Sequence, residues 1–330
     1  MTALTDRFGR RHTYLRLGLT ERCNLRCVYC MPAAGLPVTP TAQMLSAAEI
    51  GRLVRLLAAA GVERVRLTGG EPLARKDAVE IAESAAATGV RLAMTTNGLL
   101  LEDRLPALQA AGLRDLTVSL DTLRPDRFEA ITRRPGLDRV LGAIDAALAA
   151  GYAIDRPRTL KVNVVALRET QDEVTDLAAW AAREPIEVRF IEVMPFGGNA
   201  WSRGAVVPFA ETRRQIEAVH GPLQPRDDGP HATAQTFCRP GWRGRVGFVA
   251  SLTAPFCAGC NRIRITADGS LRPCLFGAAE VSLRDALRGG ATNAEVLGLV
   301  RQSLAGKHAA HAGLDALAAT STRPMITIGG

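Results

Sequence analysis

The chain has 330 residues, of which 47% are hydrophobic, and its formal net charge is +8. This hydrophobic fraction excludes a disordered chain, and no apolar run approaches the roughly 18 residues that a membrane span requires. Residues 1–12 lack the apolar segment of a secretory signal, so we expect a cytoplasmic protein. The positive charge indicates an anionic partner, which by charge alone is a nucleic acid, a membrane surface or a polyphosphate.

Short β-like runs alternate with amphipathic helical stretches through the first two-thirds of the chain. We expect strands at 14–19, 64–68, 90–95, 116–120, 159–165 and 187–193, and helices at 46–60, 77–88, 102–111, 137–150 and 172–183. Six such repeats predict a parallel sheet with helical crossovers. Because the pattern stops near Pro195, a partial (β/α)6 TIM-like barrel fits better than a closed barrel of eight strands.

The rhythm is lost from about residue 206, where prolines and scattered glycines replace it. We therefore divide the chain into a barrel domain, 1–205, and a C-terminal α+β extension, 206–330.

Three cysteines follow the first predicted strand with the spacing C-x3-C-x2-C: Cys23, Cys27 and Cys30. In a cytoplasmic protein such a group indicates metal or redox chemistry rather than disulfides. Thiolates suit iron–sulfur clusters and zinc, and three of them leave one iron of a 4Fe–4S cluster open. The alternatives are a zinc site completed by a distant residue and cysteines that are unrelated in space.

Other unusual residues end the predicted strands, where βα barrels carry their chemistry. Gly69-Gly70-Glu71-Pro72 follows the second strand, and similar groups stand at 95–98, 119–122 and 192–195. Glycines after a strand can simply form a tight turn. The functional interpretation is a close approach of the backbone to a ligand, with Glu71 accepting from a cationic amine.

Four cations interrupt the apolar strands at positions that alternation directs into the barrel: Arg16, Arg66, Lys161 and Arg189. The outer face of a parallel sheet is covered by helices, and a buried charge is costly unless it is paired. Internal ion pairs with partners such as Glu187 are one explanation. The other is an anionic substrate, and four converging cations fit a triphosphate.

The first cysteine group, with Tyr29 before Cys30, resembles the hallmark of radical S-adenosylmethionine enzymes. The resemblance implies that Cys23, Cys27 and Cys30 hold a 4Fe–4S cluster whose open iron binds S-adenosylmethionine. Reductive cleavage of this cofactor then releases a 5′-deoxyadenosyl radical. The further cofactor contacts that the resemblance implies are Tyr29, Gly70, Ser119 and Met194.

A second cysteine group, with the spacing C-x2-C-x13-C, lies in the extension: Cys257, Cys260 and Cys274. Asp268-Gly269 predicts a hairpin turn that returns Cys274 toward the pair. Cys238 could complete a four-cysteine zinc site. Spacing alone leaves zinc and an iron–sulfur cluster equally open.

With Arg262 and Arg264 after the cysteine pair, the chain resembles the GTP 3′,8-cyclase family of molybdenum cofactor biosynthesis over nearly its whole length. The resemblance implies a second 4Fe–4S cluster on Cys257, Cys260 and Cys274 that contacts guanine, and Cys238 becomes a buried small hydrophobe. The resemblance also implies catalytic roles for Arg262 and Arg264. The residues it assigns to GTP are Arg16, Arg66, Thr95, Lys161, Arg189, Arg262 and Arg264.

The implied reaction abstracts hydrogen from C3′ of GTP and joins that carbon to C8 of guanine, giving (8S)-3′,8-cyclo-7,8-dihydroguanosine 5′-triphosphate. Expected partners are an electron donor such as flavodoxin or ferredoxin and, functionally, cyclic pyranopterin monophosphate synthase. We expect no membrane or nucleic acid partner, and a monomer or homodimer. The terminal glycines, Gly329 and Gly330, are expected to enter the active site, whereas physics alone favours a frayed end.

Two other functions stay open. One is a radical S-adenosylmethionine enzyme that modifies a peptide and carries an auxiliary cluster, against which the arginines in the barrel argue. The other is a basic, zinc-holding nucleic-acid-binding protein. An aromatic content of 5%, without a basic-aromatic stripe, disfavours this alternative.

Overall fold

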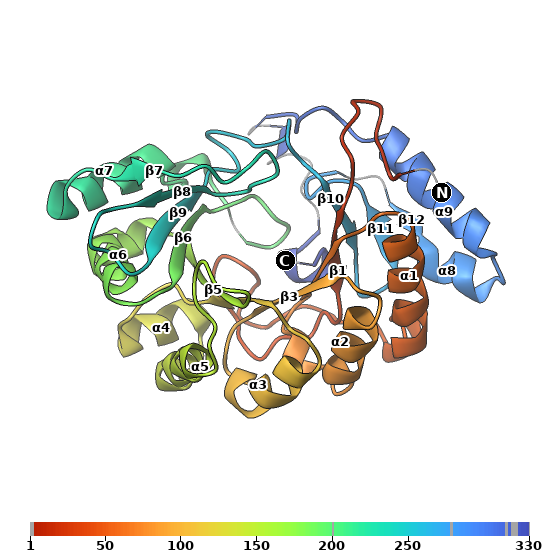
Figure 1. Ribbon diagram of the computed structural model, residues 1–330, viewed down its shortest axis with the longest axis horizontal. Coiled ribbons are helices and arrows are strands. Elements are labelled where there is room, and N and C mark those ends of the chain that lie inside the picture. Colours follow the sequence, from red (N-terminus) through yellow and green to blue (C-terminus); the bar gives the residue numbers. More distant parts are fainter. Residues whose placement is uncertain (1–2, 200, 278–279, 314–315, 318–322, 330) are drawn as a thin grey trace.

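A computed structural model describes residues 3–199, 201–277, 280–313, 316–317 and 323–329. Within these residues twelve strands form one sheet, in the order β12-β11-β10-β1-β2-β3-β4-β5-β6-β9-β8-β7. The sheet curves around an open centre and carries helices on its outside (Figure 1). The central strands are β1 (Tyr14–Gly18), β2 (Arg64–Thr68), β3 (Arg91–Thr96), β4 (Asp115–Ser119), β5 (Thr159–Ala166) and β6 (Glu187–Glu192).

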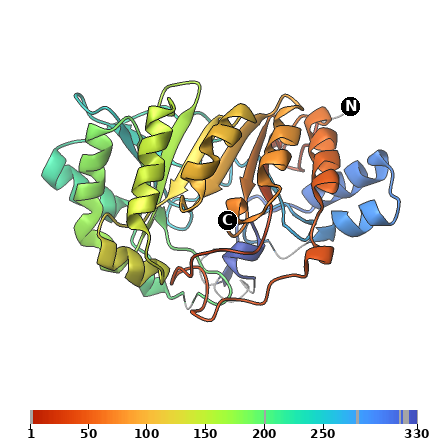
Figure 2. The ribbon, with the colours of Figure 1, turned by 90° about the horizontal axis from the view of Figure 1, so that it is seen from below.

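All six predicted strands are confirmed, and neighbouring members of the series pair in parallel. The helices between them stand side by side along the outer face (Figure 2). The predicted helices correspond to α1 (Ala47–Ala59), α2 (Ala78–Ala86), α3 (Leu101–Ala110), α5 (Leu137–Ala149) and α6 (Val174–Arg183).

Between the six predicted strands, the sequence prediction missed one helix, α4 (Pro125–Thr132), which lies between β4 and α5. Pro125 occupies its first turn, where a missing N–H costs nothing. Arg133 ends it in the left-handed conformation, with φ of 56°. The buried apolar side chains of α4 are only Phe128 and Ile131, too few to give a recognisable helical period.

The two faces of the parallel strands differ as alternation predicts. Leu15 and Leu17 of β1 are fully buried in the core between sheet and helices, whereas Arg16 between them lines the opposite, inner side. The capping box at Ser46 and Glu49 fixes the start of α1, which covers this edge of the core. The apolar core thus leaves the inner face to polar side chains.

The C-terminal extension continues the sheet at both of its edges. β10 (Arg262–Ile265) pairs in parallel with β1, and β9 (Arg245–Val249) pairs in parallel with β6. The parallel run is therefore two strands longer than the six predicted ones. The predicted hairpin at 268–269 is confirmed, because β10 pairs antiparallel with β11 (Ser270–Arg272).

The remaining elements of the extension complete its α+β character. They are α7 (Phe209–His220), β7 (Gln224–Pro225), β8 (Gln235–Cys238), β12 (Val281–Ser282), α8 (Leu283–Arg288) and α9 (Asn293–Ala305). The boundary between 1–205 and 206–330 stays a prediction. None of the helices in the described ranges has the length and apolar character that crossing a membrane requires.

Candidate active site

A cavity of about 710 Å³ opens at the centre of the curved sheet. Its lining includes all three cysteines of the first group and Cys257 and Cys274 of the second. Two groups that lie more than 200 residues apart in the sequence therefore face one space. Cys260 is half-buried next to them and is not part of the lining.

The first cysteine group lies on the loop after β1. Backbone N–H groups of Arg26 and Val28 donate to the carbonyl oxygens of Thr132 and Ile131, each at 2.9 Å. The end of α4, the helix that the sequence did not reveal, thus anchors this loop. Burial raises the pKa of Cys23, Cys27 and Cys30, the last to about 12, and neighbouring thiols raise the values of Cys27 and Cys30 further.

This donor set fits an iron–sulfur cluster, in which each thiolate binds a separate iron. Three thiols on one loop face the same cavity, and a bound cationic cluster would offset the burial that opposes their ionisation. Within the described ranges, no three His, Cys, Asp or Glu side chains are grouped closely enough to hold one metal ion.

The Gly-Gly-Glu-Pro segment has a structural role that the sequence left open. A side chain on Gly70 would come within 2.4 Å of the Arg22 carbonyl oxygen, and Gly69 has φ of 132°. The Glu71 carboxylate accepts from the Thr96 hydroxyl at 2.8 Å and the Asn97 N–H at 2.7 Å. The glycines therefore let β2 approach the cysteine loop, and Glu71, which is not part of the cavity lining, braces the end of β3.

The residues that the resemblance assigns to S-adenosylmethionine, Tyr29, Gly70, Ser119 and Met194, all line the cavity. Asp121 also lines it and accepts a hydrogen bond of 2.7 Å from the Tyr29 hydroxyl. Burial raises the pKa of Asp121 to about 6 and that of Glu71 to about 7. This end of the cavity is thus suited to a cation, which would favour both carboxylates in their charged forms.

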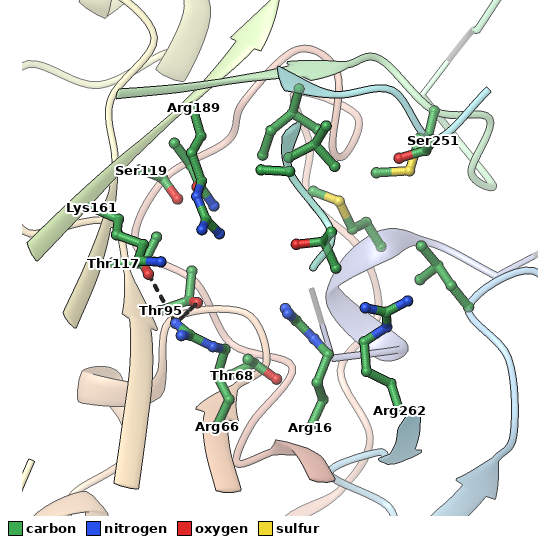
Figure 3. A pocket seen from close by; sticks show the side chains of 18 of the residues that line it. Arg16, Arg66, Thr68, Thr95, Thr117, Ser119, Lys161, Arg189, Ser251 and Arg262 are labelled. Atoms are coloured by element: carbon green, nitrogen blue, oxygen red, sulfur yellow. Dashed lines mark hydrogen bonds between the residues drawn. The ribbon is translucent and has the colours of Figure 1, made fainter. Parts of the chain in front are cut away.

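Strand register brings the predicted cations together on the inner face. Arg16 of β1 stands beside Arg66 of β2 and beside Arg264 of β10. Figure 3 shows Arg16, Arg66 and Arg262 on one side of the cavity and Lys161 and Arg189 on the other. The prediction that Arg16, Arg66, Lys161 and Arg189 face inward is confirmed, since all four line the cavity.

Arg66 is fixed by neutral groups. Its Nε donates to the Tyr14 hydroxyl at 2.5 Å, and its Nη1 donates to the hydroxyls of Thr95 at 3.1 Å and Thr117 at 2.9 Å (Figure 3). None of these partners cancels its charge. Arg66 therefore presents a rigid positive charge to the cavity at little entropic cost of ordering.

Lys161 and Arg189 agree with the explanation by internal ion pairs, because both pair with the buried Glu187 of β6. The Lys161 ammonium lies 3.5 Å from Glu187, Arg189 also contacts it, and Arg245 of β9 lies at 2.7 Å. Burial, with Arg189, lowers the pKa of Lys161 to about 7 despite Glu187. The three cations meet two carboxylates, because Arg245 also pairs with Asp155 at 2.9 Å, so this side keeps one positive charge in excess for an anionic ligand while Lys161 is protonated.

The second cysteine group lies among cations. Burial raises the pKa of Cys260, but Arg262 and Lys307 outweigh it and bring the value down to about 7. Burial, with Arg262, lowers the pKa of Arg264 to about 10. The Nη1 of Arg262 is buried and has no hydrogen-bond partner in the described part of the chain. Cys260 is therefore suited to bind an iron–sulfur cluster as a thiolate, and Arg262 fits an acceptor on a bound molecule.

Cys238 takes no part in this arrangement. It lies in β8, is half-buried rather than fully buried, and does not line the cavity. The expectation of a buried small hydrophobe is therefore wrong in its degree of burial, because β8 lies near the edge of the sheet.

The C-terminal segment reaches the cavity as far as the structure describes it. Met325 and Ile326 line the cavity, and the carbonyl oxygen of the buried Gly329 accepts a hydrogen bond of 2.9 Å from the Thr68 hydroxyl. Gly330 lies outside the described residues.

Sequence reasoning missed several residues that matter here. Thr117 shares the inner face of β4 with Ser119, so alternation could have identified it. Arg245 begins a strand with the pattern Arg-Val-Gly-Phe-Val, which the loss of the β-α rhythm obscured. Tyr14 lies at the start of β1, and Lys307 follows α9 without any sequence signal.

Comparison with known families agrees with this geometry. Residues 17–181 match the family described as Radical SAM superfamily, and residues 186–313 match Molybdenum Cofactor Synthesis C. The class is therefore that of a radical S-adenosylmethionine protein with a molybdenum cofactor synthesis extension.

Individual relatives narrow the class. The chain is 48% identical over 330 residues to "GTP 3′,8-cyclase, mitochondrial" of Arabidopsis thaliana, covering 99% of this chain and 83% of the relative. It is 42% identical over 321 residues to "GTP 3′,8-cyclase" of Rhodopirellula baltica, covering 95% and 88%. The chain belongs to the GTP 3′,8-cyclase family.

Some relatives are longer. The chain is 46% identical over 329 residues to "Molybdenum cofactor biosynthesis protein 1" of Mus musculus and covers 51% of it, so it spans about half of that relative.

Solved structures share the fold at low sequence identity. Streptococcus suis SuiB bound to precursor peptide SuiA has a TM-score of 0.60 at 14% identity, covering 88% of this chain and 66% of that one. "Native anSMEcpe with bound AdoMet" has a TM-score of 0.58 at 13% identity, covering 92% and 83%.

Proposed function

We propose that this chain converts GTP to (8S)-3′,8-cyclo-7,8-dihydroguanosine 5′-triphosphate, the first step of molybdenum cofactor biosynthesis. The observation that carries the proposal is one cavity lined by all three cysteines of the first group, by two of the three of the second, and by several cations. The printed names of the Arabidopsis and Rhodopirellula relatives give the same activity. The cytoplasmic compartment stays a prediction, because one of these relatives is named mitochondrial.

The first site would hold the radical-generating cofactors. Cys23, Cys27 and Cys30 would bind a 4Fe–4S cluster, and the proposed contacts to S-adenosylmethionine are Tyr29, Gly70, Ser119 and Met194. With both groups bound and one electron from an external reductant, this site would supply a 5′-deoxyadenosyl radical and methionine. The Asp121 carboxylate, held by the Tyr29 hydroxyl, would give this end negative charge when a sulfonium compound is bound.

The rest of the cavity would position GTP. The proposed triphosphate contacts are Arg16, Arg66, Thr95, Lys161 and Arg189, and the proposed contacts at the second cluster are Arg262 and Arg264. Cys257, Cys260 and Cys274 would hold that second 4Fe–4S cluster. The protein's contribution is to fix the ribose and base so that C3′ and C8 face each other, and to exclude water while radicals exist.

Three expectations from the sequence remain proposals. They are an electron donor such as flavodoxin or ferredoxin, functional coupling to cyclic pyranopterin monophosphate synthase, and a monomeric or homodimeric state. The division at residue 205 is a fourth.

The test is an anaerobic reaction with GTP deuterated at C3′, S-adenosylmethionine and dithionite. We expect deuterium in the 5′-deoxyadenosine and a product that separates from GTP by chromatography. The product should be one mass unit lighter than the labelled GTP, because an electron from dithionite and a solvent proton replace the deuterium that is lost. Cys27→Ser is the control and should give neither compound. If 5′-deoxyadenosine formed without deuterium and GTP were recovered unchanged, GTP would not be the substrate.

A further inference from the structure

Lys307 is a buried cation next to the second cysteine group, and it has no role in the reaction proposed above. It follows the end of α9, where its N–H donates to the Leu304 carbonyl oxygen at 3.0 Å. Only 3% of its surface is exposed. An ammonium group in such a place is costly unless it is paired, so its partners should reveal what it does.

The hydrogen-bond partners of its ammonium within the described residues both belong to the second cysteine site. The Lys307 Nζ donates to Cys260 Sγ at 3.3 Å and to the Arg262 carbonyl oxygen at 3.0 Å. The ammonium therefore touches one cysteine of the site and the backbone of the residue that follows it by two positions.

The chain around Lys307 is fixed to the same site by a second cation. Arg10 donates to the carbonyl oxygens of Cys257 and Ala309, each at 2.8 Å, and to that of His308 at 2.7 Å. Asp6 holds Arg10 through an ion pair of 2.6 Å. The N-terminal segment thus holds the chain after α9 against the cysteine pair and keeps Lys307 in place.

The first cysteine group receives a different kind of hydrogen bond. Cys23 Sγ accepts from the backbone N–H of Leu25 at 3.4 Å and from the Asn97 amide at 3.8 Å, and both donors are neutral. A charged donor stabilises the more negative state of a cluster more strongly than a neutral one.

We propose that Lys307 is a positioning and tuning residue of the second cluster: its ammonium donates to the Cys260 thiolate and makes this cluster easier to reduce. The inference rests on the proposed second cluster. It concerns the one-electron couple between the 2+ and 1+ states, in which an added electron spreads over iron and sulfur and is stabilised by the adjacent positive charge. Lys307 also donates to the Arg262 carbonyl oxygen, so it fixes the position of Arg262 relative to Cys260.

The experiment uses the full chain with Cys23, Cys27 and Cys30 replaced by serine, so that only the second cluster can form. After anaerobic reconstitution, iron is counted and the cluster is titrated with dithionite while its EPR signal is recorded. Lys307→Met removes the charge at similar volume, and Lys307→Arg retains it. Lys76→Met is the matched control, because Lys76 is exposed and does not line the cavity.

We expect a more negative potential in Lys307→Met, a smaller shift in Lys307→Arg, and none in Lys76→Met. The iron–cysteine stretching bands in the Raman spectrum should rise in frequency in Lys307→Met, because a hydrogen bond to sulfur is lost. Loss of iron from Lys307→Met alone, with the far-UV circular dichroism unchanged, would also support a role of the charge.

An unchanged potential and unchanged stretching bands in an iron-loaded Lys307→Met variant would overturn the inference. So would loss of iron together with loss of fold in both lysine variants, since Lys307 would then be a structural residue. Absence of iron from the parent variant would instead refute the second cluster itself, which separates the two failures.

Discussion

The two cysteine sites of the cavity offer the same number of thiols in opposite electrostatic surroundings. At the first site, burial and the neighbouring Asp121 raise the pKa of Cys27. At the second, Arg262 and Lys307 overcome burial and lower the pKa of Cys260 to about 7. An equal number of cysteines in the two groups thus hides an unequal distribution of charge around them.

The difference matches the two molecules that the sites would receive. S-adenosylmethionine carries a sulfonium and an amine, so carboxylates suit its end of the cavity, whereas GTP carries a polyanionic triphosphate and suits the cations. The charge distribution of the cavity would therefore direct S-adenosylmethionine to one end and GTP to the other, before the guanine or the adenosine makes any specific contact.

The largest effect is expected when the second cysteine group is removed and the first is left intact. Replacing Cys257, Cys260 and Cys274 by serine should lower the iron content from roughly eight to about four atoms per chain. It should abolish cyclised product, yet 5′-deoxyadenosine should still form, because the first site is intact. Iron analysis and chromatography of both products measure this.

Cys238→Ser is the control and should change neither quantity, since Cys238 does not line the cavity. Stoichiometric zinc in anaerobically purified protein would contradict the two-cluster account.

The next effect concerns the C-terminal segment, in which Ile326 packs with Cys30 of the first group and Gly329 meets Thr68. Deleting residues 329–330 removes the carbonyl oxygen that accepts from Thr68. We expect cyclised product to be lost and the cluster content to stay unchanged, because neither cysteine group is touched. A synthetic peptide with the native terminal sequence, added in trans, should restore part of the activity. Normal product formation by the truncated chain would mean that the segment is dispensable.

Much of the inner face could be predicted from the sequence because strand alternation has a period of two. Arg16 and Arg66 each stand between apolar residues, so each had to lie opposite the core, and both line the cavity. Local spacing likewise predicted the hairpin between β10 and β11.

The rest depends on contacts between distant segments, which local patterns do not encode. Arg245 meets Glu187 only because β9 pairs with β6, and Lys307 meets Cys260 only because α9 ends beside the second cysteine loop. The sequence left Glu71 between a tight turn and a contact to an amine, and the fold places its carboxylate at the end of β3.

An effect of intermediate size on GTP binding is expected when the single cation Arg66 is removed. Arg66→Ala should weaken GTP binding by about 1.5–3 kcal/mol, the usual worth of a charged hydrogen bond, or from roughly 10-fold to more than 100-fold in Kd. Binding of S-adenosylmethionine should barely change, because Arg66 is one of the residues assigned to GTP and is not one of those assigned to S-adenosylmethionine. Calorimetric titration of each ligand measures this.

Arg91→Ala is the matched control, since Arg91 belongs to the neighbouring β3 but pairs with Asp115 and does not line the cavity. Equal losses for both ligands in Arg66→Ala would show that this arginine holds the barrel together instead.

The smallest effect is a pH dependence. The pKa of Lys161 is lowered to about 7, so its ammonium is charged below this pH and neutral above it. GTP affinity should therefore fall a few-fold as the pH rises through about 7. Lys161→Arg stays charged throughout and should lack this fall. The terminal phosphate titrates equally in both proteins, so the ratio of their Kd values isolates the lysine. A constant ratio across the range would exclude Lys161 from the triphosphate site.

The most direct test of the difference between the two cysteine sites is to determine which ligand binds to each cluster. Two variants, each retaining one cysteine group, are reduced anaerobically and examined by pulsed EPR with nitrogen-15-labelled S-adenosylmethionine or GTP. We predict nitrogen-15 couplings from S-adenosylmethionine only with the Cys23, Cys27 and Cys30 cluster, and from GTP only with the Cys257, Cys260 and Cys274 cluster. Coupling of GTP to the first cluster, or of S-adenosylmethionine to the second, would contradict the division of the cavity by charge.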